Sequence, residues 1–385
     1  MNICFLNSIY NDTEHGGGLR TYLYLTSQEM ARQKHTVTIV TGGKPKITRE
    51  GKVTVVSVAE LPLFVHPSQM LNPSFLIKKI HYLFVATQFI LSHDFDVIEV
   101  ADTGMEHILL IFLRKAPIIT RLHGRLTDMK NLLFKNLMIN IENVVISRSD
   151  GFTIPVKSYL RYLQKTFKIQ YNDIEIIPYG ISLNTQFKKI DVRSKYNLIN
   201  KKIILSVGAL LQPVLYERKG TDILLKVATE LQQQKDIVFV VIGKIESDID
   251  VNLPSFPKNI LFLGYKNNDE LHSFFETCNL LFSSARFETF GFTIVEAMAH
   301  GKPIVATKTI GIEDVMNTKC GFFFRKESAI DAKIKILKLL NNPNLAKQMG
   351  RKGKIYAQQF DIKKTTQQTL SYYKHALAIY RLKHA

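Results

Sequence analysis

The amino-acid sequence predicts an α/β protein with two doubly wound parallel sheets, each covered by helices. Short apolar runs alternate along the chain with segments whose apolar residues recur at helical spacing. A polar, basic segment, Asn184–Lys202, interrupts this alternation, which then begins again. In addition, 385 residues exceed what one ordinary hydrophobic core organises, so we expect two domains.

The first expected domain comprises residues 1–183. Its strands are almost entirely apolar, which is typical of a parallel sheet with helices on both faces. After the first strand, Leu19–Gln33 has the periodicity of a helix. The expected strands are Ile3–Asn7, Thr36–Thr41, Val53–Val58, Asp96–Glu99, Ile118–Leu122, Val144–Ser147 and Glu175–Ile177.

The second expected domain comprises residues 203–361 and follows a linker at 184–202. Its tail has apolar side chains on one helical face, so we expect a C-terminal helix at about residues 362–385 that crosses back to the first domain. Because such sheets bind ligands outside the carboxyl ends of their strands, we expect a site in a central cleft that both domains face. The expected strands are Ile203–Val207, Val238–Ile242, Ile260–Leu263, Leu280–Ser283 and Ile304–Thr307, and the expected helices are Thr221–Gln232, Asn268–Thr277, Val295–His300 and Ser328–Leu340.

The composition is that of a soluble globular protein, with 46% apolar and 22% charged residues, but the net charge is +18. Such a charge suits nucleic acid, an anionic membrane or an anionic substrate. The sequence has no nucleic-acid-binding motif and no tryptophan, so we expect no nucleic-acid partner. We expect attraction to an anionic membrane surface or to a lipid-diphosphate acceptor, and a basic surface without any partner is the alternative.

Local features favour a cytoplasmic protein. The cysteines Cys4, Cys278 and Cys320 lack the spacing of a zinc site, and we expect reduced, buried thiols. The segment Met1–Tyr10 has the character of a first strand and not of a signal peptide. The longest lipid-compatible run, near Tyr82–Leu91, is shorter than the roughly 18 apolar residues that span a bilayer.

The most informative segment contains Glu288 and Glu296, two carboxylates eight positions apart with a turn at Phe290-Gly291-Phe292 between them. We expect the first acid in a loop and the second on the first turns of a helix. Helix N-termini attract anions, and carboxylates accept hydrogen bonds from hydroxyls. The segment therefore predicts a pocket for phosphate and hydroxyls together, as in a nucleotide-sugar site. Taken alone, Glu296 also fits an acid that the helix macrodipole favours.

Through these residues the chain resembles glycosyltransferase family 4 (GT4), a family of retaining glycosyltransferases with the GT-B fold. The resemblance covers nearly the whole chain and is strongest over Phe262–Val315, which includes Leu263-Gly264-Tyr265, the acidic pair and the run that follows it. It implies a Rossmann-like acceptor domain followed by a Rossmann-like domain that binds a nucleotide sugar.

The resemblance also implies roles for individual residues, with Glu288, His123 and Lys219 as the catalytic set. Glu288 would accept hydrogen bonds from the donor sugar, and Glu296 would hold the ribose hydroxyls. Lys219 would neutralise the diphosphate leaving group, and His123 would contact the sugar or phosphate. The residues expected to bind the donor are Gly17, Gly18, Gly208, Arg218, Lys219, Gly264, Tyr265, Glu288, Phe290, Gly291, Phe292, Thr293 and Glu296.

The chain also departs from the family pattern. Ala209 follows Gly208 where the family usually has arginine, and the loop Leu210–Arg218 looks long. Either Arg218 supplies the missing charge or the diphosphate is held more weakly. Lys34 stands in place of a usual glycine. The segment Ile177-Pro178-Tyr179-Gly180-Ile181-Ser182 matches a family segment before the linker that usually closes with aspartate, and here Ser182 stands in that place.

We therefore expect a metal-independent, retaining hexosyltransferase (EC 2.4) without a cofactor. Its donor would be a UDP- or GDP-sugar, and its acceptor a saccharide, expected to be lipid-linked and to belong to surface polysaccharide biosynthesis (lipopolysaccharide, O-antigen, capsule or exopolysaccharide). It would work in the cytoplasm, at the inner face of the cytoplasmic membrane. One alternative is a soluble small-molecule glycosyltransferase or a sucrose/trehalose-type synthase. Another is a non-catalytic carbohydrate-binding protein.

Overall fold

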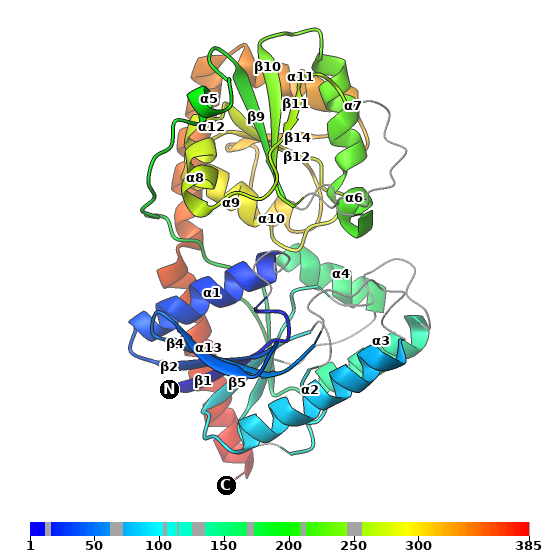
Figure 1. Cartoon of the computed structure of the whole chain (residues 1–385), viewed down its shortest axis with the longest axis vertical. Helices are drawn as coiled ribbons and strands as arrows, with labels where there is room; N and C mark the ends of the chain where they lie inside the picture. The colour runs from blue at the N-terminus through cyan, green and yellow to red at the C-terminus, as the bar shows by residue number, and fades with distance from the viewer. Residues whose placement is uncertain are drawn as a thin grey trace. The chain divides into compact units, whose positions relative to one another are not determined.

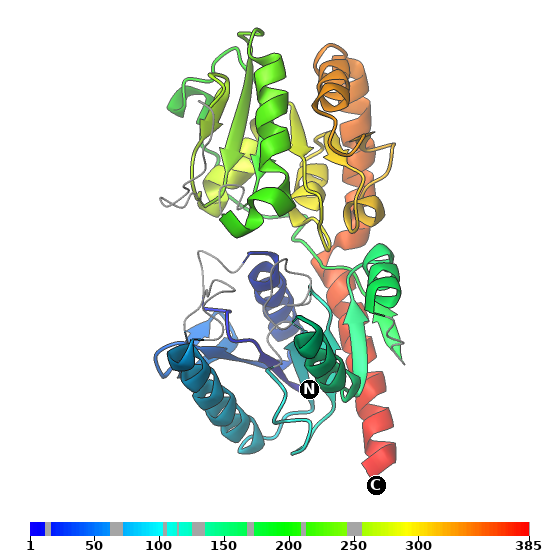
Figure 2. The same cartoon turned by 90° about the vertical axis from the view of Figure 1, so that its right-hand side faces the viewer.

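The chain folds into two compact α/β units in a computed structural model (Figures 1 and 2). The first unit contains residues 1–180 and 362–385, and the second contains residues 181–361. The described residues are 1–11, 17–61, 72–102, 106–113, 115–124, 135–167, 173–208, 213–244 and 256–384.

The first unit has a sheet in the order β3-β4-β2-β1-β5-β6-β7-β8. All neighbours are parallel except β3 and β4, and the order from β4 to β7 is that of a doubly wound dinucleotide-binding fold. Helices α1 and α13 pack together on one face, whereas α2 packs on β2 and β4 (Figures 1 and 2). The strands are β1 (Asn2–Leu6), β2 (Thr36–Gly42), β3 (Lys46–Glu50), β4 (Val53–Ala59), β5 (Val97–Ala101), β6 (Ile118–Arg121), β7 (Gly151–Ile154) and β8 (Ile174–Ile176), and the helices are α1 (Gly17–Arg32), α2 (Pro73–Leu91), α3 (Lys135–Ser147), α4 (Lys157–Phe167) and α13 (Ile362–His384).

The second unit has a six-stranded, all-parallel sheet in the order β11-β10-β9-β12-β13-β14. Its core joins α7 and α11 to the sheet through aliphatic residues and Phe239, Phe282 and Phe324. The strands are β9 (Lys202–Val207), β10 (Ile237–Ile242), β11 (Ile260–Phe262), β12 (Leu280–Ser283), β13 (Ile304–Thr307) and β14 (Gly321–Phe324), and the helices are α5 (Val192–Lys195), α6 (Pro213–Lys219), α7 (Thr221–Leu231), α8 (Asn268–Thr277), α9 (Phe292–Ala299), α10 (Ile312–Val315), α11 (Ala329–Leu340), α12 (Pro343–Tyr356) and the 3₁₀ turn η3 (Ala357–Phe360).

The predicted fold class is confirmed, but one strand was assigned wrongly. Val144–Ser147 is the last turn of α3, and the strand of this region is β7, which begins four residues later. A short β-branched run does not distinguish a strand from a buried helix end, so periodicity alone misled here. Two further strands escaped prediction: β3 is polar and largely exposed, and β14 consists of a glycine and three phenylalanines.

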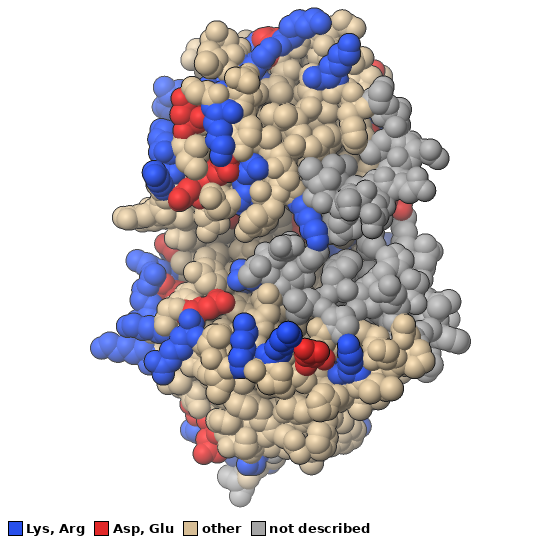
Figure 3. Space-filling view, in the orientation of Figure 1, with Lys and Arg blue, Asp and Glu red and all other residues tan. Residues whose placement is uncertain are grey.

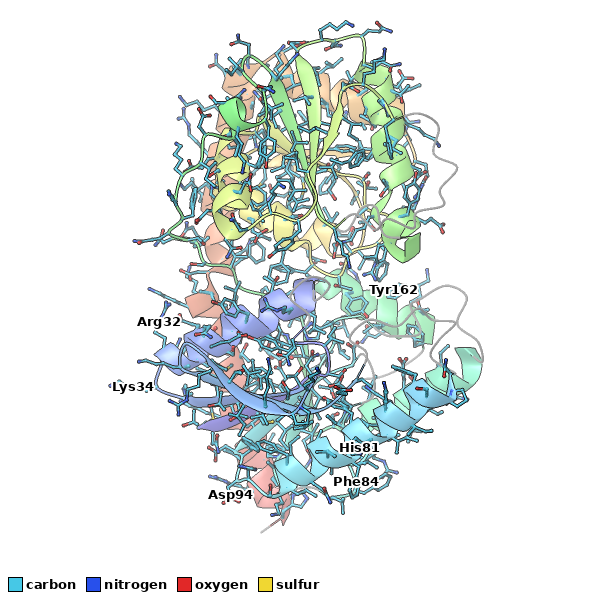
Figure 4. The ribbon with its side chains drawn as sticks, in the orientation of Figure 1. Arg32, Lys34, His81, Phe84, Asp94 and Tyr162 are labelled. Atoms are coloured by element: carbon cyan, nitrogen blue, oxygen red, sulfur yellow. The ribbon has the colours of Figure 1, made fainter. Side chains whose placement is uncertain are left out.

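Other differences concern boundaries. The helix expected at Val295–His300 begins three residues earlier, at Phe292, and the expected long loop Leu210–Arg218 contains most of helix α6, which spans Pro213–Lys219. The expected linker lies within the second unit: the Lys188 N–H donates to Asp269 at 3.0 Å and the Ile190 N–H donates to Ser273 at 2.9 Å. Lys34 adopts a left-handed φ of 67° just after α1, the conformation that favours glycine there (Figure 4).

The C-terminal helix α13 belongs to the first unit, where polar side chains fasten it to the sheet. The Tyr373 hydroxyl is fully buried and donates to Glu99 on β5. The Tyr372 hydroxyl accepts from the Phe152 N–H at 2.8 Å and donates to the Asp173 carbonyl at 2.7 Å. The cysteines Cys4, Cys278 and Cys320 are free and buried, as expected.

Helix α2 is longer than the apolar run that the sequence suggested. It begins at Pro73, which follows the capping residue Asn72, and continues for 19 residues. By length and composition it could span a membrane, so the prediction that no segment reaches that length was wrong. The error arose because Lys78 and Lys79 interrupt the run without interrupting the helix.

Candidate functional site

The second sheet has an open, glycine-lined edge at the carboxyl ends of its strands. The chain reverses its direction across the sheet between β9 and β12, and α/β sheets bind ligands at such a switch point. Gly208 follows β9 and Gly264 follows β11, with φ values of 145° and 69°. A Cβ at either position would meet no atom of the described residues within 4 Å, and glycine there allows a ligand to approach the backbone closely. Tyr265, next to Gly264, is 66% exposed.

Lys219 and Glu288 form an ion pair in the second unit. Lys219 ends α6, Glu288 lies between β12 and α9, and their Nζ and Oε2 atoms are 2.6 Å apart. The side chains are 24% and 19% exposed, so water screens the pair only partly. Burial alone would raise the pKa of Glu288, but the Lys219 and Arg218 cations together hold it below its ordinary value. Glu288 is therefore an ionised, oriented acceptor at neutral pH.

Arg218 lies beside the same carboxylate. Its guanidinium lies 4.9 Å from the centroid of the Phe287 ring, and its Nε donates to the Phe287 carbonyl at 3.5 Å. Helix α6 therefore supplies two neighbouring cations, as the prediction about Arg218 requires. Ala209 lies outside the described residues, so the two interpretations of that departure both stay open.

Arg286, which the sequence analysis missed, fixes the end of α6. Its guanidinium makes bonds of 2.7 and 2.8 Å to Asp222 and of 2.7 Å to Glu327. The same group donates to the Glu217 carbonyl at 2.8 Å, next to the turn that carries Lys219. A single arginine after a buried strand gives no sign in the sequence of these long-range partners.

Helix α9 begins at this edge with an unusual backbone. Gly291 is its N-cap, with a left-handed φ of 92° and no side-chain cap. Backbone N–H groups of a first turn, such as that of Thr293, have no acceptor within the helix and attract anions. Phe290 is 1% exposed and packs edge-to-face on Phe292 and Phe360. Of the predicted donor residues, Phe290 can therefore offer a ligand only its backbone.

Glu296 lies on the second turn of α9, eight residues after Glu288. Its side chain is half-buried, and burial raises its pKa to about 7. The protein therefore keeps an acid in a place where its charge is costly. Such a group is a functional-site candidate, since ligand hydroxyls could supply the hydrogen bonds that its carboxylate needs.

Gly220 joins Lys219 to α7, and we expect its replacement by alanine to be strongly destabilising. Its φ is +67°, and a Cβ would lie 2.0 Å from the Ser284 carbonyl oxygen. Gly264 offers a matched control, because its φ is +69° and a Cβ there meets nothing within 4 Å. Gly264→Ala should cost about 1–2 kcal/mol for the left-handed backbone alone. Gly220→Ala should cost roughly 3 kcal/mol or more in urea unfolding, and equal losses would contradict the steric argument.

In the first unit, the predicted glycines open α1. Gly17 has a φ of 49°, is exposed, and a Cβ there would meet no atom within 4 Å. Gly18 is also exposed and continues the same first turn. Gly16, the first glycine of the run, lies outside the described residues.

His123 lies at the carboxyl end of the first sheet, just after β6. Its N–H donates to Asp102 at 2.9 Å, and its Nδ1 is hydrogen-bonded to the Tyr179 hydroxyl. Burial, reinforced by the Arg121 cation, holds the pKa of His123 well below its ordinary value. The imidazole is therefore neutral and suited to hydrogen bonding.

The groups around His123 were missed as site residues. Tyr22, on the helix that Gly17 opens, has its ring centroid 5.2 Å from that of His123. Arg121 is fully buried with its guanidinium 4.4 Å from the Tyr22 ring and 5.0 Å from the Tyr179 ring. Tyr22 also donates to the buried Glu99 at 2.9 Å. This cluster holds α1 and the end of β6 in fixed positions within the unit.

Taken together, the second-unit residues suit a ligand that carries both anionic and hydroxyl groups. Two cations and a helix N-terminus can neutralise phosphates, and two carboxylates can accept from hydroxyls. Among the described residues, no group of three or more His, Cys, Asp or Glu side chains is placed to hold a metal ion.

Comparison with known proteins gives two family matches. The model described as Glycosyltransferase Family 4 matches residues 16–185, and the model described as Glycosyl transferases group 1 matches residues 188–356. An uncharacterized glycosyltransferase of Methanocaldococcus jannaschii is 35% identical over 180 residues, which are 44% of this chain and 49% of that protein. The chain thus spans about half the length of the curated relatives that it matches first.

Solved structures share the fold at low identity. Sucrose-phosphate synthase from Thermosynechococcus elongatus matches with a TM-score of 0.82 at 16% identity, over 98% of this chain and 100% of that chain. Anabaena HepE in complex with UDP-glucose matches with a TM-score of 0.71 at 18% identity, over 96% and 99% of the two chains. At such identities the matches establish the architecture of both units.

Proposed function

Because the chain belongs to glycosyltransferase family 4 and has the GT-B fold, we propose that it transfers a sugar from a nucleoside-diphosphate sugar to a saccharide acceptor. The observation that carries this proposal is the cluster of Lys219, Arg218, Glu288 and Glu296 in the second unit. These groups match the two halves of such a donor, its diphosphate and its hydroxyls. A UDP- or GDP-sugar is the proposed donor, and HepE, a structural neighbour, was solved with UDP-glucose.

The proposed reaction retains the configuration of the anomeric carbon and needs no metal ion. Lys219 and Arg218 would stabilise the charge that develops on the departing diphosphate. Glu288 would release Lys219 in part as the phosphates bind and would accept from sugar hydroxyls. Glu296 would hold the ribose, and the neutral His123 would contact the sugar or phosphate. Unchanged transfer in the presence of EDTA would support this scheme, and loss of transfer would overturn its metal independence.

The proposed acceptor is a lipid-linked saccharide of surface polysaccharide biosynthesis, modified at the inner face of the cytoplasmic membrane. The net charge of +18 supports it, as does the distribution of acids in the first unit. Among the described residues, Glu29, Glu99, Asp102, Glu106 and Glu142 are buried there, and Arg121 is a buried cation. The surface of this unit is therefore more basic than its composition suggests, which favours anionic partners.

A soluble small-molecule acceptor is the second candidate. The match to sucrose-phosphate synthase over nearly the full length of both chains favours it, since that enzyme has a similar architecture. Transfer to a water-soluble sugar or sugar phosphate without lipid or detergent would support this candidate. Transfer only to a lipid-linked saccharide would support the first.

A thermal-shift screen against UDP, GDP, ADP, CMP, dTDP and their common sugars tests the donor site. One nucleotide class should raise the melting temperature, because a ligand at a hundred times its Kd adds about 2.7 kcal/mol to the free energy of unfolding. Glu296→Ala should reduce the shift, whereas Glu276→Ala, at an exposed acid on α8 of the same unit, should not. No shift with any nucleotide, or equal loss in both variants, would refute the proposed donor site.

A further inference from the structure

Helix α2 in the first unit is apolar on the face that it buries and on the face that it leaves exposed. Its buried side is anchored, because Tyr82, Ala86 and Ile90 belong to one core cluster with β4, β5 and the segment after residue 106. A helix packed on its own sheet in this way cannot cross a bilayer without unfolding the unit. Only 22% of its most apolar window is buried, however.

The exposed side of α2 carries a stripe of large apolar side chains, with His81 among them. Ile77, Ile80 and Phe84 are 68%, 65% and 54% exposed, and their spacing of three and four residues places them on one face. Leu76, 41% exposed, widens the stripe. Figure 3 shows that the surface over α2 carries few charged side chains, and Figure 4 shows His81 and Phe84 pointing away from the sheet.

A second exposed apolar pair lies close to the C-terminal half of α2. Phe112 and Leu113 are 71% and 53% exposed, directly after Leu110 and Ile111, which pack in the same core cluster as the helix. Lys115 donates to the Leu91 carbonyl and so joins this segment to the end of α2. We call Leu76, Ile77, Ile80, Phe84, Phe112 and Leu113 the α2 patch. Soluble monomers rarely expose so many large apolar side chains on neighbouring elements without a function.

The charges beside the α2 patch indicate what covers it. No acidic residue occurs within α2, and Lys79 turns inward to Glu106, with Nζ 3.8 Å from the carboxylate and 17% of its side chain exposed. Lys78 and Lys115 are exposed beside the apolar side chains, and one exposed acid, Asp94, follows the end of α2, so the described charges next to the patch are mostly positive. A second copy of this chain would bring these cations against their equivalents, whereas an anionic lipid surface would complement them.

We propose that the α2 patch docks the first unit onto an anionic lipid bilayer, with α2 lying in the plane of the surface. The apolar side chains would enter the boundary between headgroups and acyl chains, and Lys78 would stay among the headgroups. The biological reason for docking rests on the proposed function, since docking would bring the enzyme to a lipid-linked acceptor. The surface itself follows from α2 and the neighbouring segment 112–115.

Vesicle co-sedimentation of the full chain tests the proposal. Vesicles of phosphatidylglycerol and phosphatidylcholine should bind the protein, and phosphatidylcholine alone should bind it less. Ile77→Ser/Ile80→Ser should weaken binding to anionic vesicles at least about tenfold, because two isoleucines lose their place in the lipid. Ile330→Ser/Ile334→Ser is the matched control: these residues of α11 are 64% and 54% exposed and lie in the second unit.

Several results would overturn the proposal. They are absence of vesicle binding, equal weakening in both double variants, or a wild-type dimer that light scattering shows to dissociate in the α2 variant. Both variants should keep the wild-type melting temperature within about 2 °C, since each side chain is exposed. Nucleotide-induced thermal shifts should be the same in all three proteins, so failure of docking and failure of the donor site are separately visible.

Discussion

Replacement of Lys219 by methionine is expected to lower kcat/KM for sugar transfer by about 10²–10³-fold, which corresponds to roughly 2.7–4 kcal/mol of transition-state stabilisation. Lys219 forms an ion pair with the Glu288 carboxylate, with a Nζ–Oε2 distance of 2.6 Å. A diphosphate that departs beside it would lose a fixed positive charge. Initial-rate measurement of nucleoside diphosphate release with the donor found in the thermal-shift screen gives the ratio directly.

The same substitution should also destabilise the fold, and this effect must be separated from catalysis. Glu288 would keep its carboxylate while losing its main counter-ion, at a cost of about 1–3 kcal/mol, less than for a fully buried pair because both side chains are partly exposed. The double variant Lys219→Met/Glu288→Gln should regain most of this stability, because no uncompensated charge remains. It should regain none of the activity.

Lys195→Met is the matched control for Lys219→Met. Lys195 pairs with Glu270 at 2.7 Å in the same unit, between α5 and α8. Its loss should also reduce stability, because the buried Glu270 carboxylate would lose its cation, but it should leave kcat/KM unchanged. If the double variant at Lys219 and Glu288 recovered its activity along with its stability, Lys219 would have only a structural role.

The sheets could be predicted from the sequence because their strands are buried on both faces and so appear as apolar runs. The polar, exposed strand β3 could not be predicted in this way. The strand β7 is buried but was missed, because the β-branched run Val144–Ser147 just before it suggests a strand, although it ends helix α3. The exposed stripe of α2 was hidden for a related reason. Helix α2 has large apolar residues on all its sides, so its sequence does not say which side the sheet covers.

The candidate site was predictable where its residues are close in sequence and unpredictable where they are not. Glu288 and Glu296 share one segment, and their spacing is visible in the chain. The partner of Glu288 is 69 residues away, and only the folded sheet brings Lys219 beside it. Arg286 reaches Asp222 across 64 residues and Glu327 across 41. Long-range ion pairs of this kind leave no local pattern, although they decide the charge of the site.

Glu296→Gln is expected to stabilise the free protein at neutral and alkaline pH while weakening its grip on the nucleotide. Burial raises the pKa of Glu296 from 4.5 to about 7. The folded protein therefore holds a proton that the unfolded chain releases, and folding becomes less favourable as the pH rises from about 4.5 to 7. Glutamine carries no charge, so the variant escapes this cost.

The sign and size of the effect can be checked by urea unfolding at pH 5 and pH 8. At pH 5 the variant should be more stable by less than about 1 kcal/mol, because the Glu296 carboxyl is protonated in the folded protein while it is about three-quarters ionised in the unfolded chain. At pH 8 the variant should be more stable by about 1–3 kcal/mol, the upper value being the full pKa shift converted to free energy. Glu276→Gln, in an exposed pair with Lys189, should change stability by less than about 0.5 kcal/mol at either pH.

A role in nucleotide binding would explain why the protein keeps Glu296, an acid that destabilises it. If its oxygens accept from two ribose hydroxyls, bound nucleotide supplies the hydrogen bonds that burial denies it in the free protein. Glu296→Gln should then bind the nucleotide roughly 10–100-fold more weakly in calorimetry, since an amide oxygen cannot replace two charged acceptors. A variant more stable at pH 8 with unchanged nucleotide affinity would leave Glu296 without a role in the donor site. A variant that is not stabilised at pH 8 would show that another group already compensates its charge.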